Sequence, residues 1–427
     1  MSSGRPLRIV AAAGSAFLLL LVGLTGCSGS DDRSAPTLRE VAALLARHGA
    51  AVMAHDRHAF LADVDDAPKA ITFWRDQASE FDNLARLPLA RWSYTVDAPT
   101  GDHAAQAAAG RRLGAKALVV KIDLRYAVRR ADPVPSTRSL WWTFVRRDGH
   151  VVVAGDDALA DAGGTSWRGP WDFGRLTIVR GSSSLVLGHA DPAGLSAVAA
   201  TVDAAIPAVS AVWGDGWTRY VAVIVPATEE ELSSEVDDGS PVSTADAAAA
   251  VSDAIDPLTG ALLGQRLIVN PDVLTKLTAL GRQIVIRHEV THIAAGRFTT
   301  DSTPRWLAEG FAEYVANLGS GQPPKVAAAE LRAEVAAGRI PDRLPDEAAF
   351  DTTAGAAPAY EGAWFACRLI AAKLGAPGLV QFYRLVGGDL TATSADAAAS
   401  AAMRSLLHES LARFTAEWRT YITRLLG

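Results

Sequence analysis

Three residues that can bind a metal ion or move a proton stand within five positions, His288-Glu289-Val290-Thr291-His292. In an α-helix, positions i and i+4 lie on one face, so both imidazoles can point at a single ion. Glu289 flanks that face, where its carboxylate can take a proton from a water molecule on the metal without being a ligand. The stretch therefore predicts a hydrolytic zinc site, although this pattern also arises by chance.

A hydrolytic zinc site needs a third protein ligand and leaves a fourth position open. Glu309 follows His292 by 17 positions, and Glu313 lies four residues further on, in a segment that reads as a helix. We predict that Glu309 is the third ligand and that Glu313 holds a zinc-binding imidazole by its other nitrogen. Taken alone, the two glutamates would read as solvated residues on an amphipathic helix.

Helix ends around the two motifs follow from capping rules. Gly296 is expected to cap the first helix, and Thr303 to cap the second, with Pro304 at its first position. The run QRLIVN at 265–270 precedes both helices and reads as an edge strand. An extended peptide could pair with such an edge.

The order HEVTH, then WLAEGFAEY, with 16 residues between His292 and Glu309, resembles the gluzincin metallopeptidases. The nearest pattern is the peptidase-MA-like and aminopeptidase N-like group, matched well over 265–385 and loosely over 172–427. The resemblance implies a zincin-type α+β domain, a Zn²⁺ cofactor on His288, His292 and Glu309, and a peptide or protein substrate. It also implies an oxyanion-stabilising tyrosine, which would be Tyr360 in AYEGAW.

Two departures from the family pattern narrow this expectation. The lysine of the family's Tyr-x-Lys-Gly-Ala context is absent, so Tyr360 reads equally well as a core tyrosine. The Gly-x-Met-Glu-Asn signature that holds a substrate amino terminus is absent too, since the only methionines are Met1, Met53 and Met403. The resemblance thus predicts zinc-dependent peptide hydrolysis, with Glu289 as general base, and leaves exo- or endopeptidase specificity open.

The amino-terminal residues read as an export signal. Arg5 and Arg8 precede an apolar run of about 15 residues, which is too short for a spanning helix. The run ends in LTGC, which resembles a bacterial lipoprotein signal, so we expect 1–26 to be removed and Cys27 to carry lipid. Residues 27–36 would be a tether, and the protein would sit on the outer face of the cell membrane. An ordinary secretory signal with a chance cysteine is the alternative.

Residues 37–165 begin with helical periodicity and continue with alternating strands, and RRDGH reads as a hairpin turn. This pattern resembles a cystatin-like α+β cone of the nuclear-transport-factor-two-like kind. His55 and His58 within it read as an exposed helix face and not as a site. A glycine- and tryptophan-rich segment at 160–174 marks the boundary to the metallopeptidase domain, 172–427.

The second segment reads as strands followed, after Asn270, by helices, so the expected fold class is α+β. The net charge of −6 and the lack of a long basic run argue against a nucleic-acid partner. Cys367 has no nearby histidine in sequence and reads as a buried small hydrophobe.

Two other interpretations stay open. The protein could be a non-catalytic lipoprotein binding module with a structural or vestigial zinc site, whose first domain binds a ligand or partner. The first domain could also inhibit the second or assist its folding. Metal-dependent cleavage of a peptide would separate the peptidase from the binding module.

Overall fold

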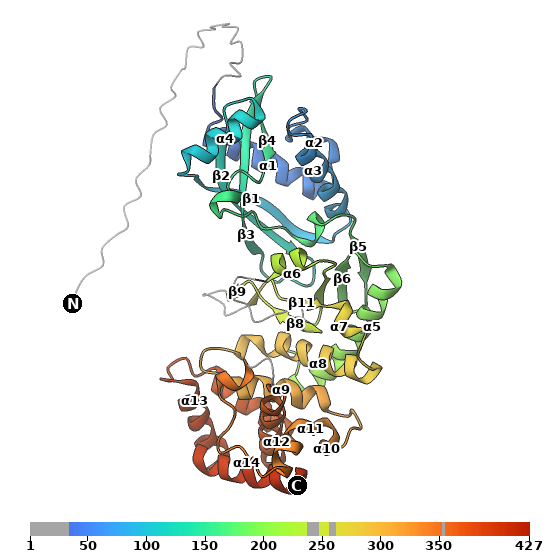
Figure 1. Ribbon diagram of the computed structural model, residues 1–427, viewed down its shortest axis with the longest axis vertical. Coiled ribbons are helices and arrows are strands. Elements are labelled where there is room, and N and C mark those ends of the chain that lie inside the picture. The colour runs from blue at the N-terminus through green and yellow to red at the C-terminus, as the bar shows by residue number, and fades with distance from the viewer. Residues whose placement is uncertain (1–33, 237–246, 256–261, 352–354) are drawn as a thin grey trace, which may run out of the picture.

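The computed structural model describes residues 34–236, 247–255, 262–351 and 355–427. It combines helices and sheets, which confirms the α+β class. Figure 1 shows an elongated molecule in which the chain passes from a first sheet, through a second sheet, to a helical region that holds the C-terminus. The expected signal sequence and Cys27 lie outside the described residues.

The first sheet is an antiparallel meander with the strand order β1-β2-β3-β4. Helices α1 and α3 pack against it, and their apolar faces and the sheet share one core that includes Phe60, Phe81 and Trp142. The elements are α1 (Leu38–Ala54), α2 (Arg57–Ala62), α3 (Ile71–Leu84), β1 (Leu89–Pro99), α4 (His103–Leu113), β2 (Leu118–Val128), β3 (Ser136–Arg147) and β4 (His150–Gly155).

The predicted hairpin turn joins β3 to β4. Arg147 pairs with His150, and the two loop residues Asp148 and Gly149 have φ angles of 47° and 83°. Positive φ at both positions is the type I′ geometry, whose twist matches that of the strands it connects. The Asp-Gly pair supplies that conformation at low steric cost, so the hairpin prediction is confirmed.

The second sheet has the order β5-β6-β7-β11-β8. Strands β6, β7 and β11 are parallel, whereas β5 and β8 run antiparallel at the two edges. The strands are β5 (Thr177–Arg180), β6 (Ser184–Gly188), β7 (Val221–Val225), β8 (Ala248–Val251) and β11 (Arg266–Val269), beside a two-stranded ribbon of β9 (Ala254–Ile255) and β10 (Leu262–Leu263).

The prediction that the run at 265–270 forms an edge strand is wrong. Its strand, β11, lies between β7 and β8, and all four of its residues are buried. A continuous apolar run is typical of a strand covered on both faces, which is the environment that β11 has. The edge on this side is instead β8, an alanine-rich strand with half-buried residues.

Helices make up the chain after β11, in the residues the structure describes. They are α7 (Pro271–Leu274), α8 (Ala279–Ala295), α9 (Arg305–Asn317), α10 (Pro324–Ala327), α11 (Ala329–Ala336), α12 (Ala357–Gly387), α13 (Ala395–Ala402) and α14 (Leu411–Leu426). Two more helices, α5 (Pro192–Trp213) and α6 (Glu229–Glu235), belong to the second sheet's connections. In Figure 1, α8 lies between that sheet and the helices α9 to α14.

Among the residues that the structure describes, the two helices α5 and α12 are long and apolar enough to cross a membrane by length and composition alone. Both contribute buried residues to one large core, together with α8, α9 and α14. Their apolar character therefore has a sufficient explanation in packing within the protein.

The two sheets are joined through a shared interior. Leu185, Leu187 and Tyr220 from the second sheet pack in the core of the first. Arg266 at the start of β11 donates through Nη1 and Nη2 to the two carboxylate oxygens of Asp132, at 2.6 and 2.9 Å. Both side chains are at most 5% exposed. This ion pair is therefore buried where the first half of the molecule, the first sheet with its helices, meets the second half, the second sheet with the C-terminal helices.

Candidate metal centre

Helix α8 carries the two histidines. The Thr278 hydroxyl accepts from the backbone N–H of Gly281 at 3.0 Å and so caps the first turn. Ile286, Val290 and Ile293 bury one side of the helix in the large core. Residues 288 and 292, four apart, are thereby held on the side that faces α9, because α8 cannot rotate without exposing its apolar side.

Gly296 occupies the C-cap position of α8, as predicted, but its φ of −52° leads into a short 3₁₀ turn and not into the left-handed conformation of many glycine caps. The start of α9 differs from the prediction. Thr303 does not cap α9, because its hydroxyl donates to the Phe298 carbonyl at 2.8 Å and Pro304 takes the capping position. A tight turn between the helices uses the hydroxyl that would otherwise cap.

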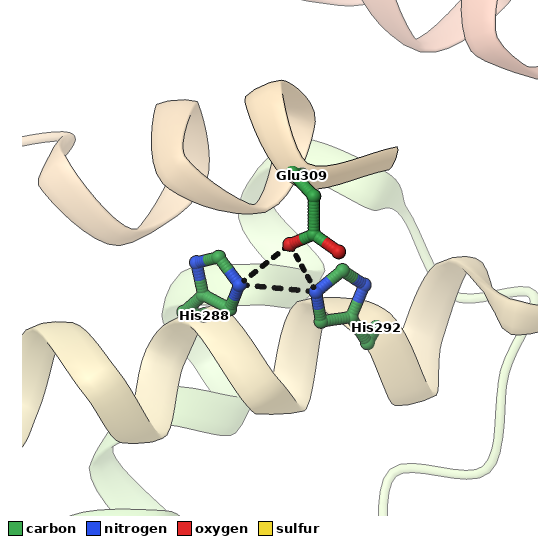
Figure 2. Close-up of side chains that lie close together, drawn as sticks. All are labelled: His288, His292 and Glu309. Carbon is green, nitrogen blue, oxygen red and sulfur yellow. Dashed lines mark hydrogen bonds and ion pairs between the residues drawn. The ribbon is translucent and has the colours of Figure 1, made fainter. Parts of the chain in front are cut away.

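Helix α9 is held close to α12 by Gly310. A Cβ atom at this position would lie 2.2 Å from the Ala363 carbonyl oxygen, so only glycine permits this approach. The preceding residue, Glu309, therefore has its backbone fixed by helix packing. Its side chain points toward α8, as Figure 2 shows.

The structure brings the three predicted ligands together. Nε2 of His288 lies 3.0 Å from Nε2 of His292, and the two nitrogens lie 3.2 and 3.3 Å from Oε2 of Glu309 (Figure 2). Zinc bonds of about 2.0–2.1 Å at tetrahedral angles place two ligand atoms about 3.3 Å apart. The three atoms thus form one triangular face of a site with the dimensions that zinc requires.

Glu313 lies where a partner for a metal-binding imidazole is needed. Its Oε1 is 3.2 Å from Nδ1 of His288, the ring nitrogen that faces away from Glu309. Asn317 holds the other carboxylate oxygen, donating from Nδ2 at 2.8 Å. The pair fixes the ring so that Nε2 is turned toward the centre.

Carboxylates dominate the charge balance around His288. Burial lowers the pKa of this ring, but its hydrogen bonds to Glu309 and Glu313 outweigh burial and raise the pKa well above its ordinary value. Burial alone would raise the pKa of Glu309, but the nearby His292 and His288 hold that pKa below its usual range. A metal ion requires the neutral imidazole and the carboxylate, so binding is coupled to release of the proton on His288.

Glu289 lies beside the three ligand atoms, and a backbone group of the second sheet holds its carboxylate. Its Oε2 accepts a hydrogen bond of 2.9 Å from the backbone N–H of Ala250 in the edge strand β8. Burial raises the pKa of Glu289, and the nearby His288 and His292 oppose that rise. A carboxylate whose pKa is moved toward neutrality suits the role of general base.

Tyr360, at the start of α12, lies over the same centre. The centroid of its ring is 6.4 Å from that of His288, and it meets Phe350 edge-on at 5.1 Å. Burial and the charge of Glu309 raise the pKa of Tyr360 to about 12, although the positive charge of Arg305 opposes them. The phenol therefore stays protonated, and can donate, over the physiological range.

Two contributors to the centre were not predicted from the sequence. Arg305 lies 4.0 Å from Glu309 through Nε and donates to Asp351 at 2.5 Å. Arg305 stands one helical turn before Glu309, and this i, i+4 spacing in the sequence could have predicted the contact. The Ala250 N–H is a backbone group, for which the sequence offers no corresponding signal.

The remaining candidate residues lie apart from this centre. His55 and His58 are exposed, as predicted. Cys367 is fully buried in the large core, and burial raises the pKa of its thiol far above the ordinary value. A thiol in that environment is not a nucleophile.

Comparison with known proteins adds no further residues to this centre. No protein-family model matches the sequence, and no curated protein is significantly similar to it. The chemistry of the centre must therefore follow from its own geometry.

Proposed function

We propose that this protein is a zinc-dependent peptidase of the gluzincin type. The observation that carries the proposal is the triangle of His288, His292 and Glu309, whose ligand atoms all lie within 4.8 Å of one another. Two nitrogens and one carboxylate oxygen, with an open fourth position, are the donor set of hydrolytic zinc centres. Ligand spacing, the Glu313 contact and the nearby Glu289 support the same assignment.

Zinc, when bound, would lower the pKa of a water molecule toward ~7 and polarise the carbonyl group of the substrate. Glu289 takes the proton from the attacking water and returns it to the leaving amine. Tyr360 donates a hydrogen bond to the oxygen that gains negative charge as the water attacks. The positive charge of Arg305, which acts on Tyr360, favours the same developing negative charge.

The substrate class is a peptide or protein in extended conformation. Strand β8 is the edge of the second sheet and carries Ala250, whose N–H contacts the proposed base. Alternate backbone groups of an antiparallel edge strand point outward, where a peptide can add as a further strand. A peptide bound in this way would run past Glu289 and the metal ligands.

We also infer that the first sheet and its helices form a cystatin-like cone of the nuclear-transport-factor-two-like kind, and that the second sheet with α8 and α9 forms a zincin-type domain. Lipid on Cys27 anchors the protein to the outer face of the cell membrane.

Metal content is the first test. Elemental analysis of the purified chain should find one zinc ion per molecule, and the Glu309→Ala variant should hold much less. A chelator should abolish cleavage of peptide libraries, and added zinc should restore it. A well-folded chain without zinc would overturn the proposal and leave the binding module as the better interpretation.

A further inference from the structure

The proposed base depends on a strand that is clamped at its end by the other half of the molecule. Two residues after β8, Asp253 accepts a hydrogen bond from Arg138 of β3 in the first sheet. The two side chains are only 10% and 13% exposed. The ion pair therefore ties the end of the edge strand to the first sheet in a largely dry setting, where loss of one partner is costly.

A second contact fixes the strand that pairs with β8. Arg266, the first residue of β11, is held by Asp132 from the segment between β2 and β3. In the ladder, Arg266 is paired with Val251, and Leu267 with Ala250. Both strands that determine the position of Ala250 are thus held by residues of the first sheet region.

Arg138 is itself held in place. Its guanidinium lies 5.0 Å from the ring centroid of Trp167, and the indole Nε1 of Trp167 donates to the Ser234 carbonyl at 2.9 Å. Ser234 belongs to α6, a helix of the second half. The ion pair between Arg138 and Asp253 is therefore supported by contacts in both halves of the molecule and is not a flexible surface pair.

We propose that Arg138 and Asp132 are positioning residues: they hold β8 and β11 in place so that the Ala250 N–H keeps the Glu289 carboxylate aimed at the metal centre. The first half of the molecule is thereby a structural part of the active centre, although Arg138 lies 150 positions before His288, the nearest proposed ligand in sequence. The role given to Glu289 rests on the proposed function, but the clamp on β8 does not. A displacement of about 1 Å in a catalytic group lowers turnover by up to about 100-fold, so this support has a measurable effect.

Amide hydrogen exchange of the full chain tests the clamp. We expect the Arg138→Gln variant to raise exchange in 247–255 by at least about tenfold, while the peptides of α8 and α12 keep the wild-type rate. Asp253→Asn should do the same, and the double variant should exceed neither single variant, because both remove one interaction.

The matched control is Arg147→Gln. Arg147 lies on the same strand, and its ion pair with Asp65 (side chains 25% and 1% exposed) stays within the first half. Its variant should leave exchange in 247–255 unchanged. Equal exchange in the two arginine variants, raised or not, would overturn the clamp.

Kinetics of the same variants test positioning. Arg138→Gln should lower kcat about tenfold or more, with KM and zinc content close to wild type, whereas Arg147→Gln should leave kcat unchanged. Raised exchange with an unchanged kcat would overturn the positioning role. If the wild-type chain cleaves no peptide, the proposed function fails, and the exchange data still decide whether the clamp exists.

Discussion

The Nδ1 atom of His288 lies 3.2 Å from Glu313, while the Nε2 atom of the same ring lies 3.2 Å from Glu309. One imidazole is thus held between two carboxylates that stand a single helical turn apart on α9. Only one of these carboxylates can share a metal ion with Nε2, since the other faces the opposite side of the ring. Glu309 is therefore placed as a metal ligand and Glu313 as the residue that orients the imidazole, and experiments can distinguish the two roles.

Replacing Glu313 by Gln should weaken zinc binding by about 10- to 100-fold without abolishing it, because the ring loses a charged partner and keeps its place. Competition with a chromophoric chelator measures the affinity. Glu229→Gln, on the exposed first turn of α6, is the control and should bind as wild type. Loss as complete as in Glu309→Ala would instead make Glu313 a ligand.

The Glu289→Gln variant should keep one zinc ion and lose at least about 100-fold in kcat, since an amide cannot accept the proton of the attacking water. Gln can still accept the hydrogen bond from Ala250, so β8 should stay in place. Single-turnover assays beside elemental analysis measure both quantities. Turnover close to wild type would refute the assignment of the base.

Tyr360→Phe should lower kcat by about 10- to 100-fold and leave zinc content unchanged, because a donor to the developing negative charge is removed. Tyr314→Phe, a half-buried tyrosine on α9, serves as the control. The core-tyrosine interpretation predicts another pattern, in which thermal stability falls and kcat does not. Melting curves and initial rates of both variants distinguish the two.

The buried pair of Asp132 and Arg266 should be sensitive to loss of one partner. Asp132→Asn should reduce the free energy of unfolding by about 3–5 kcal/mol, because it leaves the Arg266 guanidinium buried without its counter-ion. Replacing both residues, as Asp132→Leu with Arg266→Met, should be less harmful. Urea titration measures both, and a single variant as stable as wild type would contradict the burial of this contact.

His189 should make stability depend on pH. Its Nε2 lies 3.2 Å from the fully buried Glu231, and its Nδ1 donates to the Arg175 carbonyl at 3.1 Å. The contact with Glu231 raises the pKa of His189, although burial opposes it. A raised folded-state pKa means that the stabilisation is complete below the unfolded value of about 6.5 and is lost as pH rises through the folded value.

For this half-buried group the change should be no more than about 1 kcal/mol. Urea midpoints of wild type and His189→Gln, measured between pH 5.5 and pH 8.5, should converge at the alkaline end. A difference that grows toward alkaline pH would contradict the assignment.

The centre was predictable where side-chain spacing carries the information. His288 and His292 share a face because of helical periodicity, and Glu309 and Glu313 follow the same rule on the next helix. Spacing could not show which strand lies beside Glu289, because β8 contributes a backbone N–H from a run of alanines. The apolar run at 265–270 was predicted to be the edge strand, and that prediction is wrong. Its strand, β11, is fully buried and lies inside the sheet.

The fold was predictable to a similar degree. Alternation and the Asp-Gly turn identified the β3–β4 hairpin, whose dihedral angles depend only on local residues. The ion pairs that join the two halves were not predictable, because Asp132 and Arg266 lie 134 positions apart and each reads as an ordinary surface charge. Charged residues so far apart in sequence reveal a pairing only once the chain is folded.

The buried thiol of Cys367 offers a way to measure how often the helix packing behind the metal centre opens. Its Sγ lies 3.9 Å from the Leu307 carbonyl and would be 3.0 Å from a side-chain carbon at Gly310, so it sits in the seam between α12 and α9. A thiol reagent can reach it only when those helices part, which also releases the packing that fixes the backbone of Glu309. Because Cys27 is expected to carry lipid, thiol labelling would report on Cys367. The labelling rate then measures how often α9 and α12 separate, and a bound metal ion should lower that rate.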